Sequence, residues 1–280
     1  MRSRREVILT AAGLVAGAGA LAACGKDEES GLNVLVVTPE VLAGQDQRLA
    51  LVLQDDAKEY VAPKRATVRF GSSPDRFETP SAAAIVHRDA APAPAYLTVP
   101  VRLSPAGTVF VEVTADGRRA VAPVRLVDAL AGPVVGRALP SVATPTTIDL
   151  AGVSTLCTRQ PACPLHGTSL DTALLAGRPL VVLVATPAFC QTAACGPVLD
   201  ILLGALPAGP SAPMAIHLEV YAERPKGSEI TRTPVAPAVK AFGLTSEPML
   251  FVVGADGKVT RRIEGLFGRA EVTEALASIS

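Results

Sequence analysis

The spacing of apolar residues changes halfway along the chain, and this change constrains the fold more than any other feature. From Gly31 to Asp128 apolar and polar residues alternate with a period of two, which is typical of half-buried β-strands. After residue 148 short continuous apolar runs alternate with stretches of helical period. A chain of 280 residues accommodates one large domain or two ordinary ones. We therefore expect an all-β domain over 31–128, a Gly- and Pro-containing linker over 129–147 and an α/β domain over 148–280.

The first domain is predicted to be an immunoglobulin-like β-sandwich, because seven short strands in about a hundred residues fit that architecture. The strands are expected at Leu32–Val37, Arg48–Leu53, Ala66–Phe70, Ala83–His87, Tyr96–Leu103, Thr108–Val113 and Arg119–Val127. The Cys…Trp…Cys signature of antibody domains is missing, so the resemblance is one of architecture. We expect His87, its only histidine, to be a surface or core residue rather than a ligand. The domain could act as a spacer, a docking surface or a dimer contact.

The first 24 residues are predicted to be an export signal. Three arginines precede an uncharged apolar run of 17 residues, Val7 to Ala23, which is short for a membrane span and suits a secretory signal. Leu21-Ala22-Ala23-Cys24 resembles the bacterial lipobox, which implies lipidation of Cys24. Ser3–Leu9 resembles the twin-arginine export consensus, with an ordinary Sec signal as the alternative. We expect a lipid-anchored protein on the outer face of a bacterial cytoplasmic membrane.

The cysteine count agrees with export. Five cysteines is an odd number, and removing the lipidated Cys24 leaves four, all within 39 residues of the second half. They are Cys157, Cys163, Cys190 and Cys195. Outside the cytoplasm an even set predicts disulfides, with three possible connectivities.

The second domain shows an alternation of strand and helix patterns. Strands are expected at Leu180–Ala185, Ala215–Tyr221, Met249–Val253 and Lys258–Ile263, and helices at 193–205, Val235–Phe242 and Arg269–Ile279. The resulting order is β-α-β-α-β-β-α, which is the core order of the thioredoxin fold.

Three segments of this domain resemble the thioredoxin superfamily: Leu180–Cys190, which resembles the strand leading to the active-site cysteine, Ser246–Val253, and the hairpin Gly254–Val259. The resemblance implies an α/β thioredoxin-like fold in which Pro248 is the cis-proline facing the cysteine pair. It further implies thiol–disulfide exchange, with Cys190 attacking, Cys195 resolving and Pro248 shaping the substrate groove. The implied partners are exported protein thiols or disulfides, and a membrane thiol reductase. No cofactor and no metal ligand are expected.

The redox motif departs from the family pattern, because Cys190 and Cys195 form a Cys-x4-Cys rather than a Cys-x-x-Cys. In a regular helix Cα atoms five positions apart are roughly 8–9 Å apart, whereas a disulfide needs less than about 7 Å. Cys190 must therefore lie in the loop before the helix, or the first turn must rearrange. Some peroxiredoxins share this spacing, and Thr186–Cys190 is similar to their motif. The stretch Leu244–Pro248 lacks the arginine that they require, so exchange is favoured over peroxidase chemistry.

Cys157 and Cys163 form a second pair, for which three interpretations stay open. A disulfide between them would staple an irregular extension, which is the favoured interpretation. As a shuttle pair they would pass electrons to the first pair. With His166 or His217 they resemble the copper-chaperone branch of the superfamily, although the spacing departs from its pattern. We expect His217, in an apolar strand, to be a core or edge residue.

Two classes of function remain: a membrane-anchored thiol–disulfide oxidoreductase, and a binding or scaffolding lipoprotein in which all four cysteines are structural. The composition excludes a third class. With 26 basic and 26 acidic side chains and a pI near 6.8, the chain lacks the basic excess typical of nucleic-acid-binding proteins.

Overall fold

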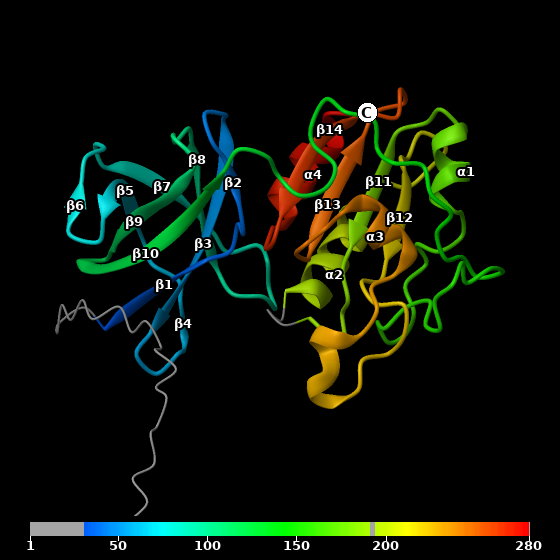
Figure 1. Ribbon diagram of the computed structural model, residues 1–280, viewed down its shortest axis with the longest axis horizontal. Coiled ribbons are helices and arrows are strands. Elements are labelled where there is room, and N and C mark those ends of the chain that lie inside the picture. The colour runs from blue at the N-terminus through cyan, green and yellow to red at the C-terminus, as the bar shows by residue number, and fades with distance from the viewer. Residues whose placement is uncertain (1–30, 191–193, 280) are drawn as a thin grey trace, which may run out of the picture.

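A computed structural model describes residues 31–190 and 194–279, which form an all-β part and an α/β part packed against each other (Figure 1). The predicted export signal, Cys24 and the predicted first residue of the helix 193–205 lie outside these ranges. Within them, no helix combines the length and apolar character needed to cross a membrane.

The all-β part contains the seven strands predicted from the period-two pattern. They are β1 (Leu32–Val36), β3 (Gln47–Asp55), β5 (Ala66–Ser73), β7 (Ala82–His87), β8 (Tyr96–Val101), β9 (Gly107–Ala115) and β10 (Arg118–Val127). The two-residue strands β2 (Val41–Leu42), β4 (Tyr60–Val61) and β6 (Arg76–Phe77) add to these. Buried apolar residues from six of the long strands form one core, which contains Leu49, Leu51 and Val111.

The strands of this part form one continuous path rather than the two separate sheets of a sandwich. The order is β1-β3-β8-β7-β5-β9-β10-β2. β7 joins the two halves, since its first residues pair with β5 and its last residues, Ile85 to His87, pair with β8. The alternation of apolar and polar residues predicts where the strands lie. It does not predict that the two halves of β7 pair with different strands.

The α/β part has the predicted order β-α-β-α-β-β-α. Its elements are β11 (Leu180–Val184), α2 (Cys195–Ala205), β12 (Met214–Leu218), α3 (Pro237–Phe242), β13 (Met249–Val253), β14 (Val259–Glu264) and α4 (Arg269–Ala277). The sheet order is β12-β11-β13-β14, with β12 parallel and β13 antiparallel to β11. Two short elements were not predicted: α1 (Leu170–Leu175) and the 3-10 helix η1 (Gly227–Arg232).

Helices cover both faces of this sheet. Val181 and Leu183 of β11 share a core with α2 and α4. Leu180, Val182 and Val184 share another core with α1 and α3. Every residue of β11 is buried, which explains its continuous apolar sequence. Because β11 is central, the loop after it is held firmly at one edge of the sheet.

The all-β part caps the first turn of α4, where the helix has unpaired backbone N–H groups. The Tyr96 hydroxyl accepts a hydrogen bond from the Gly268 N–H (2.6 Å), and the Asp89 carboxylate accepts one from the Ala270 N–H (2.7 Å). Residue 268 is glycine because a Cβ there would lie 2.3 Å from an Asp89 carboxylate oxygen. Arg48 completes the contact through two hydrogen bonds to the Glu271 carboxylate (2.6 and 2.8 Å).

The segment 129–147 also contacts the α/β part. Leu139 is buried in the core on the α1 and α3 face, and Ala138 forms an isolated bridge with Lys258. The latter half of this segment therefore follows the surface of the α/β part closely.

Candidate functional site

Cys190 and Cys195 meet at the beginning of α2. Cys190 lies, half-buried, in the loop that follows β11, and Cys195 is the first residue of the helix and fully buried. The Cys195 N–H donates a hydrogen bond to Cys190 Sγ at 3.3 Å. This arrangement is the first of the two that the Cys-x4-Cys spacing allows, with the first cysteine in the loop before the helix.

The electrostatics of the pair distinguish its two members. Hydrogen bonding to Cys190 and burial both raise the pKa of Cys195, and a negative charge on Cys190 adds to the shift. Backbone N–H groups at a helix N-terminus favour a nearby thiolate. Negative charge on this pair is therefore better placed on Cys190 than on Cys195.

Pro248 lies at the start of β13, on the segment that borders this pair. The Glu247–Pro248 bond is cis, and Pro248 is buried with its carbonyl accepting a hydrogen bond from the Gly265 N–H (2.9 Å). Burial and the charge on Cys190 raise the pKa of Glu247. The Glu247 carboxyl group is therefore close enough to Cys190 for their charges to interact.

A second cluster brings together Cys157, Cys163, His166 and His217. Their four potential ligand atoms all lie within 4.8 Å of one another, and all four residues are buried. Cys163 Sγ lies 3.2 Å from His166 Nε2 and 3.4 Å from His217 Nδ1, and Cys157 Sγ lies 3.8 Å from His217 Nδ1. This convergence differs from the sequence-based expectation of no metal ligands.

The fold builds this cluster from two distant segments. Cys157, Cys163 and His166 belong to the irregular stretch before α1, whereas His217 lies on β12. The two segments are joined by a hydrogen bond from the His217 N–H to the Leu165 carbonyl (3.1 Å). His217 is a core residue, as predicted. It also joins the two cysteines beside which it was considered as a ligand in the less favoured metal-binding interpretation. The spacing Cys-x5-Cys-x2-His, together with a buried histidine on a strand, was the available signal.

The four cysteines of the described ranges are free thiols. Hydrogen bonding between Cys157 and Cys163 lowers the pKa of Cys157, with further hydrogen bonds from the two histidines. The same contact, together with burial, raises the pKa of Cys163. The contact between the two sulfur atoms therefore favours negative charge on Cys157 over negative charge on Cys163.

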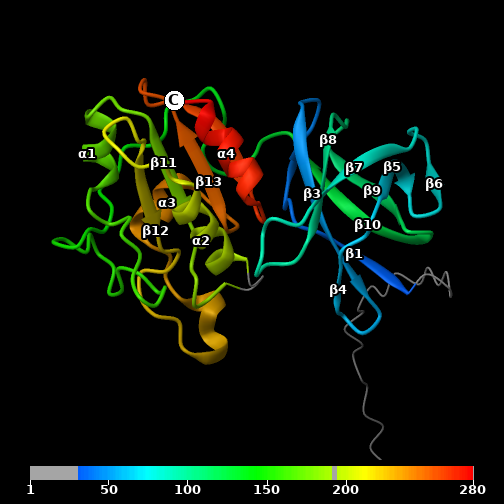
Figure 2. The same cartoon turned by 180° about the vertical axis from the view of Figure 1, so that it is seen from behind.

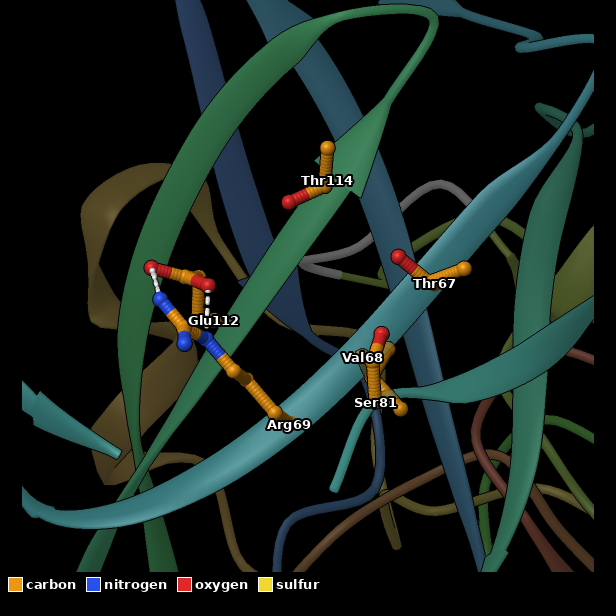
Figure 3. A pocket seen from close by; sticks show the side chains of 6 residues that line it. All are labelled: Thr67, Val68, Arg69, Ser81, Glu112 and Thr114. Atoms are coloured by element: carbon orange, nitrogen blue, oxygen red, sulfur yellow. Dashed lines mark hydrogen bonds and ion pairs between the residues drawn. The ribbon is translucent and has the colours of Figure 1, made fainter. Parts of the chain in front are cut away.

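Two features of the all-β part carry no comparable chemistry. A shallow pocket on β5 and β9 is lined by Arg69 and Glu112, which bond to each other (Figure 3). Burial of Glu112 acts to raise its pKa, but hydrogen bonds from Arg69 and Arg119 lower it overall. The two guanidinium groups therefore neutralise the charge of the Glu112 carboxylate. His87 stacks on Tyr96 with ring centroids 4.5 Å apart, which is a structural role.

Comparisons with known proteins leave the family of the chain open. No family model matches the chain, and no curated protein matches it. A thioredoxin-family thiol:disulfide interchange protein from Chlorobium tepidum is 14% identical, covering 55% of this chain and 99% of that one, with a TM-score of 0.31. The Lin-41 filamin domain is 10% identical over 34% of this chain and 93% of its own length, with a TM-score of 0.23. A CARDB domain from Pyrococcus furiosus is 15% identical, covering 35% of this chain and 96% of that one, with a TM-score of 0.21. At such identities and scores, function has to be inferred from the geometry of this chain.

Proposed function

We propose that this protein is a membrane-anchored, extracytoplasmic thiol–disulfide oxidoreductase that acts through Cys190 and Cys195 on a thioredoxin-like domain. The observation that carries the proposal is the hydrogen bond from the Cys195 N–H to Cys190 Sγ at the start of α2. It joins the sulfur of the half-buried Cys190, which would attack the substrate, to the backbone of the fully buried Cys195, which would resolve the reaction.

The geometry supports a two-step exchange. The Cys190 thiolate attacks one sulfur of a substrate disulfide, forms a mixed disulfide and releases the other substrate sulfur as a thiolate. Cys195 then loses its proton and attacks Cys190, which releases the second substrate sulfur and leaves a Cys190–Cys195 disulfide. Two electrons thus pass to the substrate, and the reverse sequence would oxidise a dithiol.

The raised pKa of Cys195 bears on the order of these steps. Hydrogen bonding to Cys190 and burial raise the pKa of the Cys195 thiol, and negative charge on Cys190 raises it further. Formation of the mixed disulfide removes that charge. The Cys195 thiol is then easier to ionise, at the stage when there is a mixed disulfide to resolve.

The remaining parts of the proposal concern partners and location. The lipidated Cys24 would anchor the chain to the membrane, and the immunoglobulin-like all-β part would hold the redox domain away from the bilayer or dock a partner. Exported proteins with thiols or disulfides are the proposed substrates, and a membrane thiol reductase would be the electron donor. Pro248, beside Glu247, would shape the groove that receives the substrate chain.

Trapping of the mixed disulfide tests the exchange reaction. In the full-length chain Cys195→Ser should accumulate disulfide-linked adducts on Cys190, because the resolving sulfur is missing. Cys190→Ser should accumulate none, and the control Cys190→Ser/Cys195→Ser, which lacks both sulfurs of the pair, should accumulate none either. Adducts are read on non-reducing gels, and the linked cysteine is identified by mass spectrometry. Absence of adducts on Cys190 in cells would count against exchange.

A redox titration separates this function from a purely structural role. An exchange disulfide between Cys190 and Cys195 should be reduced between roughly −120 and −270 mV, the range of known oxidoreductases. A bond that persists below about −300 mV would identify a structural staple. The protein would then be a binding module. Alkylation and peptide mapping at each potential assign the transition to individual cysteines.

A further inference from the structure

We propose that Cys157, Cys163, His166 and His217 bind one Zn²⁺ ion in a closed tetrahedral site. Zinc is held in structural sites by four ligands, with Cys₂His₂ among the common sets. The four residues supply two sulfur and two nitrogen ligands, and all are buried. This inference does not depend on the proposed exchange reaction, because the two sites share no residue.

The distances in the cluster fit such an ion. With Zn–S near 2.3 Å and Zn–N near 2.0–2.1 Å, the edges of a tetrahedron are about 3.3–3.8 Å long. The observed sulfur–nitrogen separations are 3.2 Å (Cys163–His166), 3.4 Å (Cys163–His217) and 3.8 Å (Cys157–His217). These three separations therefore lie within a few tenths of an ångström of tetrahedral edges. All four ligand atoms lie within 4.8 Å of one another, so the remaining edges would contract further when the ion binds.

The orientation of His217 is already that of a metal ligand. Its Nε2 faces the Ala185 carbonyl at 3.1 Å. Nε2 therefore carries the proton, and the lone pair of Nδ1 points toward the two sulfur atoms. A ligating histidine that donates its other N–H to a carbonyl is the usual outer-shell arrangement of metal sites. The Nδ1 of His166 has no hydrogen-bond partner among the described residues. An outer hydrogen bond therefore fixes the ring orientation of His217 but not that of His166.

The charge of the site also favours a divalent ion. Binding releases the protons of both thiols, and two thiolates neutralise Zn²⁺ while two imidazoles remain neutral. The buried site then carries no net charge, which avoids the cost of an isolated buried ion. Calcium and magnesium prefer oxygen ligands, whereas thiolate and imidazole in tetrahedral geometry suit zinc.

The ion would hold the irregular stretch before α1 against the sheet. Cys157 is followed by Thr158, whose hydroxyl accepts a hydrogen bond from the Ala188 N–H (3.1 Å), two residues before Cys190. Zinc at the cluster therefore ties this stretch to β12 and also supports the loop that carries Cys190. It would also make Cys157 and Cys163 unavailable as a shuttle pair.

Metal content of the full-length chain tests the proposal. Protein purified under reducing conditions with Zn²⁺ should hold one zinc per chain by elemental analysis. Cys163→Ser and His217→Ala should weaken zinc binding more than the roughly 10–100-fold that loss of an outer-shell partner costs. Cys190→Ser/Cys195→Ser is the matched control and should keep one zinc. Equal zinc content in all variants, or none in the wild type, would overturn the site.

A measurement on the wild type avoids variants that fail to fold. Bound zinc should protect Cys157 and Cys163 from alkylation, and a strong chelator should expose them, while Cys190 reacts in both states. Cobalt(II) substituted for zinc should show the visible bands of a tetrahedral ion with thiolate ligands. A Cys157–Cys163 disulfide in the protein as isolated from cells would overturn the proposal, as would stronger retention of Cu(I) than of Zn²⁺.

Discussion

Cys190 and Cys195 are only five positions apart, but they differ in environment because α2 begins at Cys195. Cys195 is the first residue of α2 and is fully buried, whereas Cys190 remains in the preceding loop and half-buried. The hydrogen bond from the Cys195 N–H makes Cys190 the better place for negative charge. A nearby acid, Glu247, opposes that charge, and its effect can be measured.

Replacing Glu247 by glutamine should increase the reactivity of Cys190. Burial and the charge on Cys190 raise the pKa of Glu247, and the repulsion is mutual. Once ionised, Glu247 therefore disfavours the Cys190 thiolate, while glutamine does not. In Glu247→Gln the pH profile of Cys190 alkylation should move to lower pH, by up to about one unit.

The profile is measured from alkylation rates of the Cys190 peptide by mass spectrometry. Glu274→Gln serves as the control, because this acid is an exposed residue of α4. An unchanged profile in Glu247→Gln, or a shift to higher pH, would contradict the electrostatic coupling between the two side chains.

At the level of residues, the sequence favours one cysteine pair as a site but does not favour the metal-ligand cluster. Cys190 and Cys195 could be singled out because they follow a Val-rich buried strand in a recognisable pattern. His217 was considered as a ligand beside Cys157 and Cys163, but 60 and 54 positions separate it from them, so the sequence could not favour this interpretation over a disulfide. Only the pairing of β12 with the stretch before α1 brings these side chains together.

At the level of elements, long periodic segments were predictable and short ones were not. β9 and β10 were both expected from the alternation of apolar and polar residues in the sequence, and β10 also alternates between more and less buried residues in the structure. α1 has six residues and lacks a side-chain hydrogen bond at its N-cap, Ser169, so its local signals are weak. It is held by burial of Leu170 and Ala173 instead, which depends on the rest of the fold.

The N-terminus of α4 shows how one part of the chain completes an element of the other. The Tyr96 hydroxyl accepts the hydrogen bond from the Gly268 N–H, and Tyr96 itself is 1% exposed. Tyr96→Phe removes this acceptor and leaves a buried N–H unpaired. We expect a loss of about 1–3 kcal/mol in the free energy of unfolding.

Urea denaturation of the full-length chain measures this loss. The matched variant Tyr60→Phe removes a hydroxyl from a tyrosine that is 52% exposed, and it should leave the stability within about 0.5 kcal/mol of the wild type. Equal stability of Tyr96→Phe and Tyr60→Phe would show that solvent or a rearranged side chain caps the helix instead.

At the scale of the whole molecule, the two parts of the chain are joined by side chains from β3, β8 and the loop before β8. Figures 1 and 2 show this edge of the all-β part beside α4. Val52, Ala90, Ala93 and Tyr96 belong to the same apolar cluster as residues of α2 and α4. The all-β part is therefore an integral support of the α/β part.

Arg48 is the polar centre of this contact. Its guanidinium donates hydrogen bonds to the Glu271 carboxylate and to the carbonyl of Leu266 (2.6 Å), and its side chain is 22% exposed. Arg48→Ala leaves the partly buried Glu271 carboxylate without this partner. Because hydrogen bonds to charged groups contribute about 1.5–3 kcal/mol, the variant should be destabilised by a similar amount.

Arg48→Ala should also weaken the coupling between the two parts, so that they unfold at more widely separated temperatures than in the wild type. Scanning calorimetry of the full-length chain reports both changes. Arg102→Ala is the matched control, because Arg102 and its partner Asp46 are 63% and 77% exposed, and such pairs contribute about 0–1 kcal/mol. If the two variants gave the same thermograms, the contact through Arg48 would not couple the parts. The support that the all-β part gives to α4 would then rest on the apolar cluster around Tyr96 alone.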